Sequence, residues 1–421
     1  MRYIGLEKDI INKILTVLTG GVLAQIITLA FTPLITRIYS PEEFGVFSQV
    51  SQLSSFIVPL LTLSLPLSIV KQDVNCGLLE VCLSIVKVAL TIFVFLNLIV
   101  IVVDYTFDMS NVTFYMAMFI ALNVAIQESL MYVLIRKQYY KIRSIVLIIQ
   151  ALVISFLKLS IGKIDASFFS LFISTLIGYS LLNSFVFIYL RTQVARKKKA
   201  SLLDLMSNNM DLIKYRTPQS LISNLNILLP ILAISYYYTT AEAGMYALAR
   251  TVLVMPATIL GKSISDVFYP RFSDKYKQRK GIISELKAIS LIIFCISFAF
   301  VTFMLLSSDW LFEFIFGKEW SNAGVYAKWV SVWVLFNIIN KPFVALIPVF
   351  RMEKYFLKNS FLNLAITVVA IIIGSQLYSE ASDLVLILSI MTTFPQLIIM
   401  LLTTREVLKY EKEKISNLRG I

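Results

Sequence analysis

The sequence contains no histidine and only three cysteines among its 421 residues. The lack of histidine excludes imidazole-based acid–base catalysis, a Ser–His–Asp triad and histidine metal ligands. Cys76, Cys82 and Cys295 do not have the spacing of a metal site or a redox motif. We therefore expect no catalytic residue, no metal and no cofactor.

Long polar segments are also scarce, because 58% of the residues are hydrophobic and 15% are charged. Such a chain has no room for a large soluble domain. The connections at about 104–111, 239–242 and 378–382 are too short to build a catalytic pocket. A Ser–Lys or paired-carboxylate enzyme stays conceivable, but the sequence predicts a protein that is not an enzyme.

Apolar stretches fill the chain almost from end to end. A helix needs about 20 apolar residues to cross the hydrocarbon core of a bilayer. Pro33 and Arg37 stand where a signal peptide would have a small-residue cleavage site, so we expect the first stretch to be retained. The sequence predicts an all-α integral membrane protein with about 12 transmembrane helices, at 11–36, 44–70, 81–103, 112–135, 144–161, 166–190, 218–238, 243–270, 284–307, 322–350, 359–377 and 383–404.

The basic residues fall on alternate sides of these stretches. Both ends and every second loop are basic, whereas the opposite loops hold only Arg37, Lys163 and Lys318. By the positive-inside rule, the basic side is cytoplasmic. We expect a multi-pass protein of the bacterial inner membrane with cytoplasmic N and C termini. This topology explains the net charge of +13, so membrane lipid is an expected partner and nucleic acid is not.

One long polar, basic connection divides the chain. It covers residues 191–217 and separates the first six stretches from the last six. We predict an N-terminal six-helix lobe (1–190), a basic cytoplasmic linker (191–217), and a C-terminal six-helix lobe with a cytoplasmic tail (218–421).

An internal repeat supports two lobes. Residues 39–48 (YSPEEFGVFS) and 238–247 (YTTAEAGMYA) share the pattern Y-[ST]-x-x-E-x-G-x-[FY]-[SA], and prolines recur at nearly the same offset. Parallel repeats predict pseudo-twofold symmetry along the membrane normal, with the substrate path between the halves. An old duplication without functional symmetry is the alternative. Seven prolines inside the stretches are either hinges or static kinks: Pro33, Pro59, Pro66, Pro230, Pro256, Pro342 and Pro395.

Charges inside membrane spans are costly and usually face a bundle interior or a wet cavity. Arg250 and Lys341 have no acid one helical turn away, and both are too deep to reach the interface easily. Together with Lys262 and Arg37, they are the predicted substrate-binding cations of a cavity for an anionic substrate. For Arg37 the alternative is a side chain that extends to the lipid headgroups.

Three further charged residues suit ion coupling or structural pairing. Lys87 and Glu128 lie at similar depths in adjacent predicted spans, so we expect a buried pair between them. Asp266 follows Lys262 by four residues, and these two can neutralise each other. A proton or Na⁺ site at Glu128 or Asp266 stays open as the other interpretation.

Two segments carry a family resemblance. Residues 36–48 (TRIYSPEEFGVFS) resemble the first-loop signature of the O-antigen and polysaccharide flippases, in the polysaccharide transporter branch of the multidrug/oligosaccharidyl-lipid/polysaccharide exporter superfamily. The second half supplies the family's ordered pattern with Pro230, Gly244, Tyr246, Arg250, Pro256, Gly261 and the run 267–270 (VFYP). Related proteins often have an Arg–Tyr–Glu-like segment late in span 2. This chain has Leu65 to Ser68 there, so no charged role carries over.

The resemblance implies a flippase for undecaprenyl-pyrophosphate-linked oligosaccharide, which moves repeat units to the periplasmic leaflet by alternating access for O-antigen biosynthesis. A glycan polymerase and a chain-length regulator are the implied partners, and a monomer is the expected state. A cation-coupled exporter of small amphipathic compounds is one alternative, although acids rather than bases would then be expected in the spans. A membrane glycan polymerase is another, although it would need a large external loop.

Overall fold

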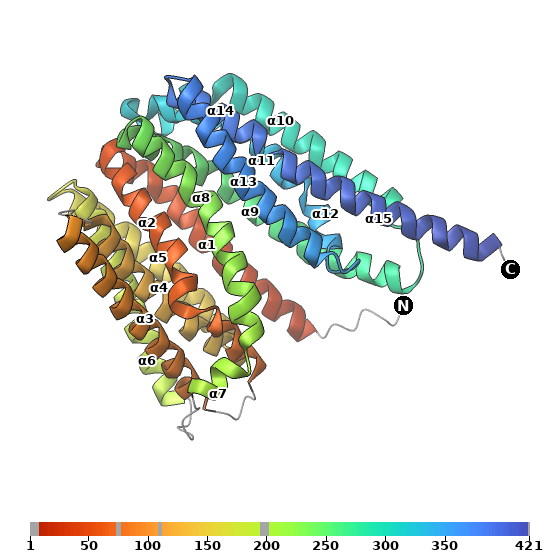
Figure 1. Ribbon diagram of the computed structural model, residues 1–421, viewed down its shortest axis with the longest axis horizontal. Helices are drawn as coiled ribbons and strands as arrows, with labels where there is room; N and C mark the ends of the chain where they lie inside the picture. Colours follow the sequence, from red (N-terminus) through yellow and green to blue (C-terminus); the bar gives the residue numbers. More distant parts are fainter. Residues whose placement is uncertain (1–7, 73–76, 108–111, 194–201, 420–421) are drawn as a thin grey trace. The chain divides into compact units, whose positions relative to one another are not determined.

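A computed structural model describes residues 8–72, 77–107, 112–193 and 202–419, and these are helical without any strand. The chain divides into two compact units, Met1–Leu228 and Leu229–Ile421. Cys76 and part of the predicted linker, residues 194–201, lie outside the described residues. The described part of the linker includes a short helix, α7 (Leu202–Ser207), and a π-helical turn, η2 (Leu212–Arg216), and its two ends belong to the neighbouring long helices (Figure 1). The predicted lobe boundaries stay predictions.

The helices of the first unit follow the predicted order of spans. They are α1 (Lys8–Thr36), α2 (Pro41–Thr62), η1 (Leu65–Lys71), α3 (Leu78–Phe107), α4 (Val112–Arg136), α5 (Tyr140–Gly162), α6 (Phe168–Gln193), α7 (Leu202–Ser207) and η2 (Leu212–Arg216). The next helix, α8 (Thr217–Tyr237), begins in the first unit and ends in the second.

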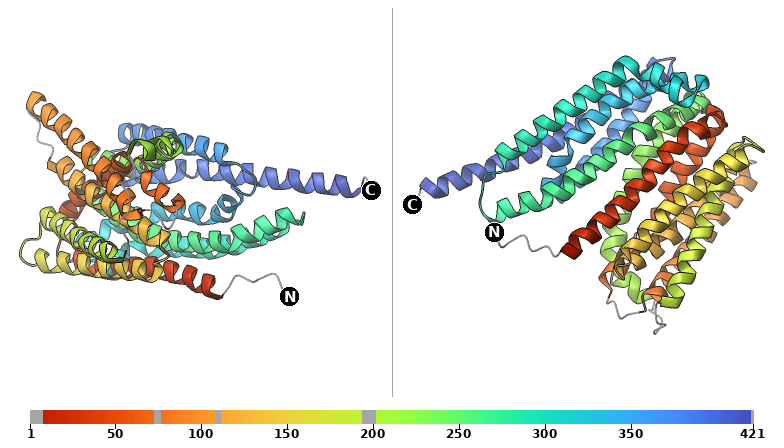
Figure 2. Two further views of the ribbon diagram at one scale, coloured as in Figure 1. Left: turned by 90° about the horizontal axis from the view of Figure 1, so that it is seen from below. Right: turned by 180° about the vertical axis from the view of Figure 1, so that it is seen from behind.

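The second unit contains the remaining helices. They are α9 (Thr240–Lys277), α10 (Ile283–Phe316), η3 (Lys318–Trp320), α11 (Ser321–Ile339), α12 (Lys341–Leu346), α13 (Glu353–Leu377), α14 (Ala381–Met391) and α15 (Phe394–Arg419). Figure 2 shows α15 as a long helix that ends near the C terminus.

Among the described residues, eleven helical segments are long and apolar enough to cross a membrane. The part of α1 from Gly20 to Thr36 adds a shorter apolar helix. The predicted class, an all-α multi-pass membrane protein with about 12 transmembrane helices, is therefore confirmed.

Three predicted spans are interrupted rather than continuous. The span expected at 44–70 ends as α2, passes through Leu63 and Ser64 with φ of 49° and 54°, and continues as the 3-10 segment η1. The span expected at 322–350 is divided into α11 and α12, and the last span into α14 and α15. Pro66, Pro342 and Pro395 are each the second residue of the segment after the break. That position suits proline, since its missing N–H is not needed in the first turn.

Each unit has one central helix. In the first unit α4 packs against α2, α3 and α6, and α5 packs against α6. In the second unit α11 packs in the same way against α9, α10 and α14, and α13 packs against α14. These four pairs correspond span by span, so the two halves share one internal packing plan.

The third span of each half has a large exposed apolar surface. On α3, Phe95 and Val102 are 61% and 60% exposed, and on α10 Leu291 and Leu306 are 63% and 81% exposed. Such surfaces are stable only against lipid or another apolar partner. We therefore expect α3 and α10 to face the bilayer.

The sequence repeat has the same local structure in both halves. Ser40 and Thr239 each cap the following helix, because their hydroxyls accept from the amides of Glu43 and Glu242. Both helices are the second span of their half. The duplication seen in the sequence is therefore also present in the helix starts.

Candidate functional site

Arg250 lies deep within α9. It is ten residues from the start of this helix, which is about 15 Å at 1.5 Å per residue, near the middle of a bilayer core. The side chain is half-buried, and its Cζ lies 5.9 Å from the ring centroid of Trp333 on α11. No carboxylate pairs with it among the residues that the structure describes. The ring partly compensates the charge and leaves the planar donor edge of the guanidinium available.

Lys341 is the first residue of α12, directly after the break that follows α11. Its side chain is half-buried and crosses Gly261 of α9. A Cβ atom at Gly261 would lie 2.7 Å from Cε and 2.9 Å from Cδ of Lys341, so the glycine leaves room for the lysine stem. In the described part of the chain this ammonium has no carboxylate partner either.

Arg250 and Gly261 lie on nearly the same face of α9. They are eleven residues apart, which is about 16 Å along the axis and about 20° around it. The helices α11 and α12 both pack against α9. One face of α9 therefore joins two cations at different depths, one held by Trp333 and the other by the gap at Gly261.

Two other predicted cations have open surroundings. Lys262 is exposed on α9, and Arg37 is exposed in the turn after α1. The backbone of Asp266 belongs to α9, but its side chain lies outside the described residues, so the expected pair with Lys262 stays a prediction.

The expected pair between Lys87 and Glu128 stays a prediction. Lys87 is exposed on α3, whereas Glu128 is half-buried on α4, and no ion pair joins these two described residues. Arg216, at the end of η2, is one cation near enough to interact electrostatically with Glu128. Equal depth in adjacent spans does not fix which face of a helix each side chain occupies, so the sequence alone does not decide the partner of Glu128.

Lys158 was not singled out in the sequence. Its Nζ lies 4.3 Å from the ring centroid of Phe47, and its backbone carbonyl accepts a hydrogen bond of 2.8 Å from the Tyr39 hydroxyl. Lys158 is four residues from the end of α5, where an interfacial lysine is ordinary. The sequence signal that could have identified it is Tyr39, since this residue belongs to the repeat.

Some polar residues that could have served a ligand instead join helices. Gln127 and Gln150 exchange side-chain amide hydrogen bonds between α4 and α5. Asn224 donates to the carbonyl of Ser55 over 2.8 Å. Helix–helix hydrogen bonding is the simpler role for these groups.

The helical packing and the apolar spans define a class, the multi-pass membrane proteins, and solved structures share this fold. The lipid II flippase MurJ in an inward closed conformation has a TM-score of 0.69 at 14% identity, over 94% of this chain and 90% of that one. An inward-facing multidrug resistance MATE family transporter of the MOP superfamily has a TM-score of 0.62 at 12% identity, over 94% and 95%. A MOP superfamily transporter from Pyrococcus furiosus has a TM-score of 0.57 at 10% identity, over 95% and 96%.

The family is narrower than this class. The chain belongs to the polysaccharide biosynthesis protein family, whose pattern matches residues 34–324. The lipopolysaccharide biosynthesis protein WzxC of Escherichia coli (strain K12) is 24% identical over 221 residues, which are 51% of this chain and 44% of WzxC. The chain thus matches less than half the length of that relative. The resemblance found in the sequence is confirmed for the family and the fold.

Proposed function

We propose that this protein is a flippase that moves undecaprenyl-pyrophosphate-linked oligosaccharide repeat units from the cytoplasmic to the periplasmic leaflet, for surface polysaccharide such as O-antigen. It would act in the bacterial inner membrane with both termini in the cytoplasm. The observation that carries the proposal is the pair of cations, Arg250 and Lys341, along one face of α9.

A pyrophosphate loses favourable hydration when it leaves water, and fixed cations offset that cost. The Arg250 guanidinium suits phosphate because its planar fork donates two parallel hydrogen bonds to oxygen atoms. Lys341 provides a compact charge at another depth. The two cations would hold the pyrophosphate in succession as it crosses, while the polyprenyl tail stays in lipid. Lys262 and Arg37 would attract it from their exposed positions.

Alternating access would come from movement of the lobe 1–190 against the lobe 218–421, with the linker 191–217 between them. The protein would work as a monomer and pass its product to a glycan polymerase and a chain-length regulator. Glu128 and Asp266 are the acids available for ion coupling in this scheme.

The test is surface-glycan display in a strain that lacks the protein, complemented with variants. Loss of polymer with single lipid-linked units on the cytoplasmic leaflet supports a flippase. Single units on the periplasmic leaflet would indicate a polymerase, and an unchanged glycan would indicate an exporter of another substrate. We expect Arg250→Ala to lose display, Arg250→Lys to keep part of it, and the exposed control Lys163→Ala to behave as wild type, at equal protein levels.

A further inference from the structure

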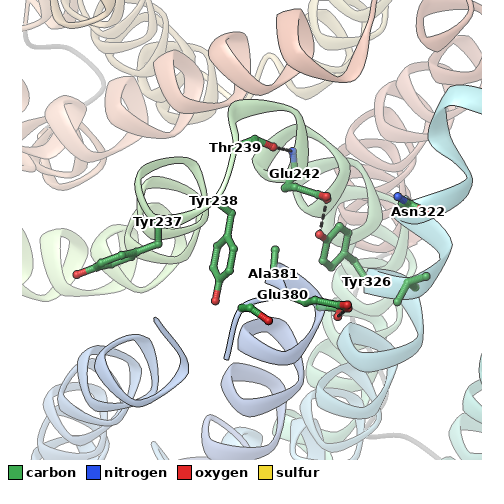
Figure 3. A pocket seen from close by; sticks show the side chains of 11 residues that line it. Tyr237, Tyr238, Thr239, Glu242, Asn322, Tyr326, Glu380 and Ala381 are labelled. Atoms are coloured by element: carbon green, nitrogen blue, oxygen red, sulfur yellow. Dashed lines mark hydrogen bonds between the residues drawn. The ribbon is translucent and has the colours of Figure 1, made fainter. Parts of the chain in front are cut away.

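One end of the second unit contains a cavity of about 600 Å³ (Figure 3). It is lined by the end of α8, the first turn of α9, the start of α11 and the loop before α14. Its wall includes Tyr237, Tyr238, Glu242, Asn322, Tyr326 and Glu380. The predicted topology places this end on the periplasmic side.

The inner wall of the cavity is fixed before any ligand arrives. Tyr326 is only 3% exposed, and its hydroxyl donates to the Glu242 carboxylate. The Tyr238 hydroxyl donates to the carbonyl of Tyr378 over 3.1 Å. These contacts hold two rings and one carboxylate in place.

The outer wall is open to a ligand. Tyr237 is 51% exposed, and its ring stands against that of Tyr236 with centroids 5.0 Å apart. Glu380 is exposed and accepts a bond of 3.3 Å from the Ser382 hydroxyl. A carboxylate has about four lone-pair positions. The carboxylates of Glu242 and Glu380 can therefore accept further hydrogen bonds beside the contacts given above.

The corresponding motif in the first unit is closed. Tyr39 is 1% exposed and bonded to α5, and the Glu43 carboxylate accepts the backbone amide of Phe168 at the start of α6. In the second unit, Tyr238 is only half-buried, and the Glu242 carboxylate accepts from the Tyr326 hydroxyl, which belongs to the wall of the cavity. The two copies of one motif have therefore diverged, with space for a ligand in the second.

The chemistry of this cavity selects its ligand. Phenol rings cover the apolar C–H faces of a pyranose, while carboxylates and hydroxyls bind its hydroxyl groups. None of the residues that line the cavity is Lys or Arg, so an anionic group would be repelled by Glu242 and Glu380. Among the described residues, no cluster of three acids, histidines or cysteines suits a metal ion.

We infer that this outer cavity binds a neutral or amino sugar and discriminates against uronic acids. Resting on the proposed function, the inference assigns the cavity to a sugar of the lipid-linked oligosaccharide. Glu242 is eight residues from Arg250, about 12 Å along α9. A short oligosaccharide can span that distance, with its pyrophosphate at Arg250 and a distal sugar in the cavity.

The test is isothermal titration calorimetry on the full chain in lipid nanodiscs, with three soluble probes. These are the disaccharides of N-acetylglucosamine and of glucosamine, and a disaccharide that contains glucuronic acid. We expect the first two to bind about tenfold more tightly than the third. Glu380→Gln lies on an exposed loop and Tyr326→Phe keeps its ring, so both should fold. Each should weaken glucosamine binding severalfold, whereas the control Glu43→Gln in the closed copy should not.

Three results would overturn the inference: no disaccharide binds, the glucuronic acid probe binds as tightly as the others, or both cavity variants bind as wild type does. The probes carry neither lipid nor pyrophosphate. Failure of the flippase proposal would therefore leave this result unchanged, and failure here would leave transport of the pyrophosphate lipid intact.

Discussion

At the scale of single residues, Arg250 and Lys341 are cations inside the membrane spans, where charge is expensive. Neither has a carboxylate partner in the part of the chain that the structure describes. Each side chain has an uncharged support from another helix: Arg250 lies against the Trp333 ring, and the stem of Lys341 passes over Gly261. A charge that served only packing would be expected to have an acid beside it. The supports position the cations and leave them free for an anion.

Gly261→Ala tests the support of Lys341. The added methyl group would displace the flexible end of the lysine without moving backbone, so we expect transport to fall severalfold with little loss of folded protein. In a Lys341→Ala background the same change should have no further effect, since the displaced group is gone. Transport rates of the two single variants and the double variant give the answer, and full additivity would contradict the contact.

The surroundings of Glu128 give a second prediction. Lys87→Ala should leave thermal stability unchanged because this lysine is exposed. Glu128→Gln and Arg216→Gln should be non-additive, with a coupling below about 1 kcal/mol because Arg216 is exposed. Melting of the purified variants in detergent measures this. A coupling of Glu128 to Lys87 instead would support the pair that the sequence predicts.

Sequence reasoning at this scale identified isolated intramembrane charges but not their neighbours. Arg250 and Lys341 stand out because the residues one turn away are apolar or neutral. Trp333 lies against Arg250, Gly261 lies against Lys341, and each comes from another helix. Arg216 likewise approaches Glu128 from another element. No spacing along the chain reveals these contacts. Lys158 was missed for the same reason.

The repeated helix starts belong to the scale of the element. Ser40 and Thr239 each satisfy an amide that the helix itself leaves free. Thr239 also stands at the rim of the outer cavity, whereas Ser40 stands in the closed copy.

Removing either cap should destabilise its half to a similar extent. Ser40→Ala and Thr239→Ala should each cost about 1 kcal/mol of stability. Only Thr239→Ala should also weaken disaccharide binding, since it loosens the turn that carries Glu242. Melting curves and titrations on the same preparations separate the two effects, and equal sugar binding by both variants would contradict a ligand role for this turn.

The hydrophobicity of the sequence predicts which membrane helices exist, but not where they are interrupted. Apolar length predicted the spans, but it does not detect breaks such as that between α2 and η1. The sequence predicts Pro66, Pro342 and Pro395 to be kinks or hinges within spans. In the structure each is the second residue of a new helical segment. The cavity could not be predicted either, because three chain segments far apart in sequence build it, within 237–242, 322–326 and 379–382.

Membrane topology is the prediction at the scale of the whole molecule. In a chain without its native cysteines, a cysteine at Ser379 should react with an impermeant maleimide in intact cells. A cysteine at Lys277 should react only after the inner membrane is permeabilised, since the positive-inside rule places that end of α9 in the cytoplasm. The reverse pattern would invert the proposed direction of transport.

Proteoliposomes that contain the pure protein and an undecaprenyl-pyrophosphate-linked repeat unit test the central claim most directly. An impermeant glycosidase outside consumes the sugars that face it. With wild-type protein we predict that consumption proceeds to near completion, because inner-leaflet units cross. With empty liposomes or Arg250→Ala, it should stop at the outer-leaflet share. Wild-type protein that stops at the same level as empty liposomes would contradict the flippase.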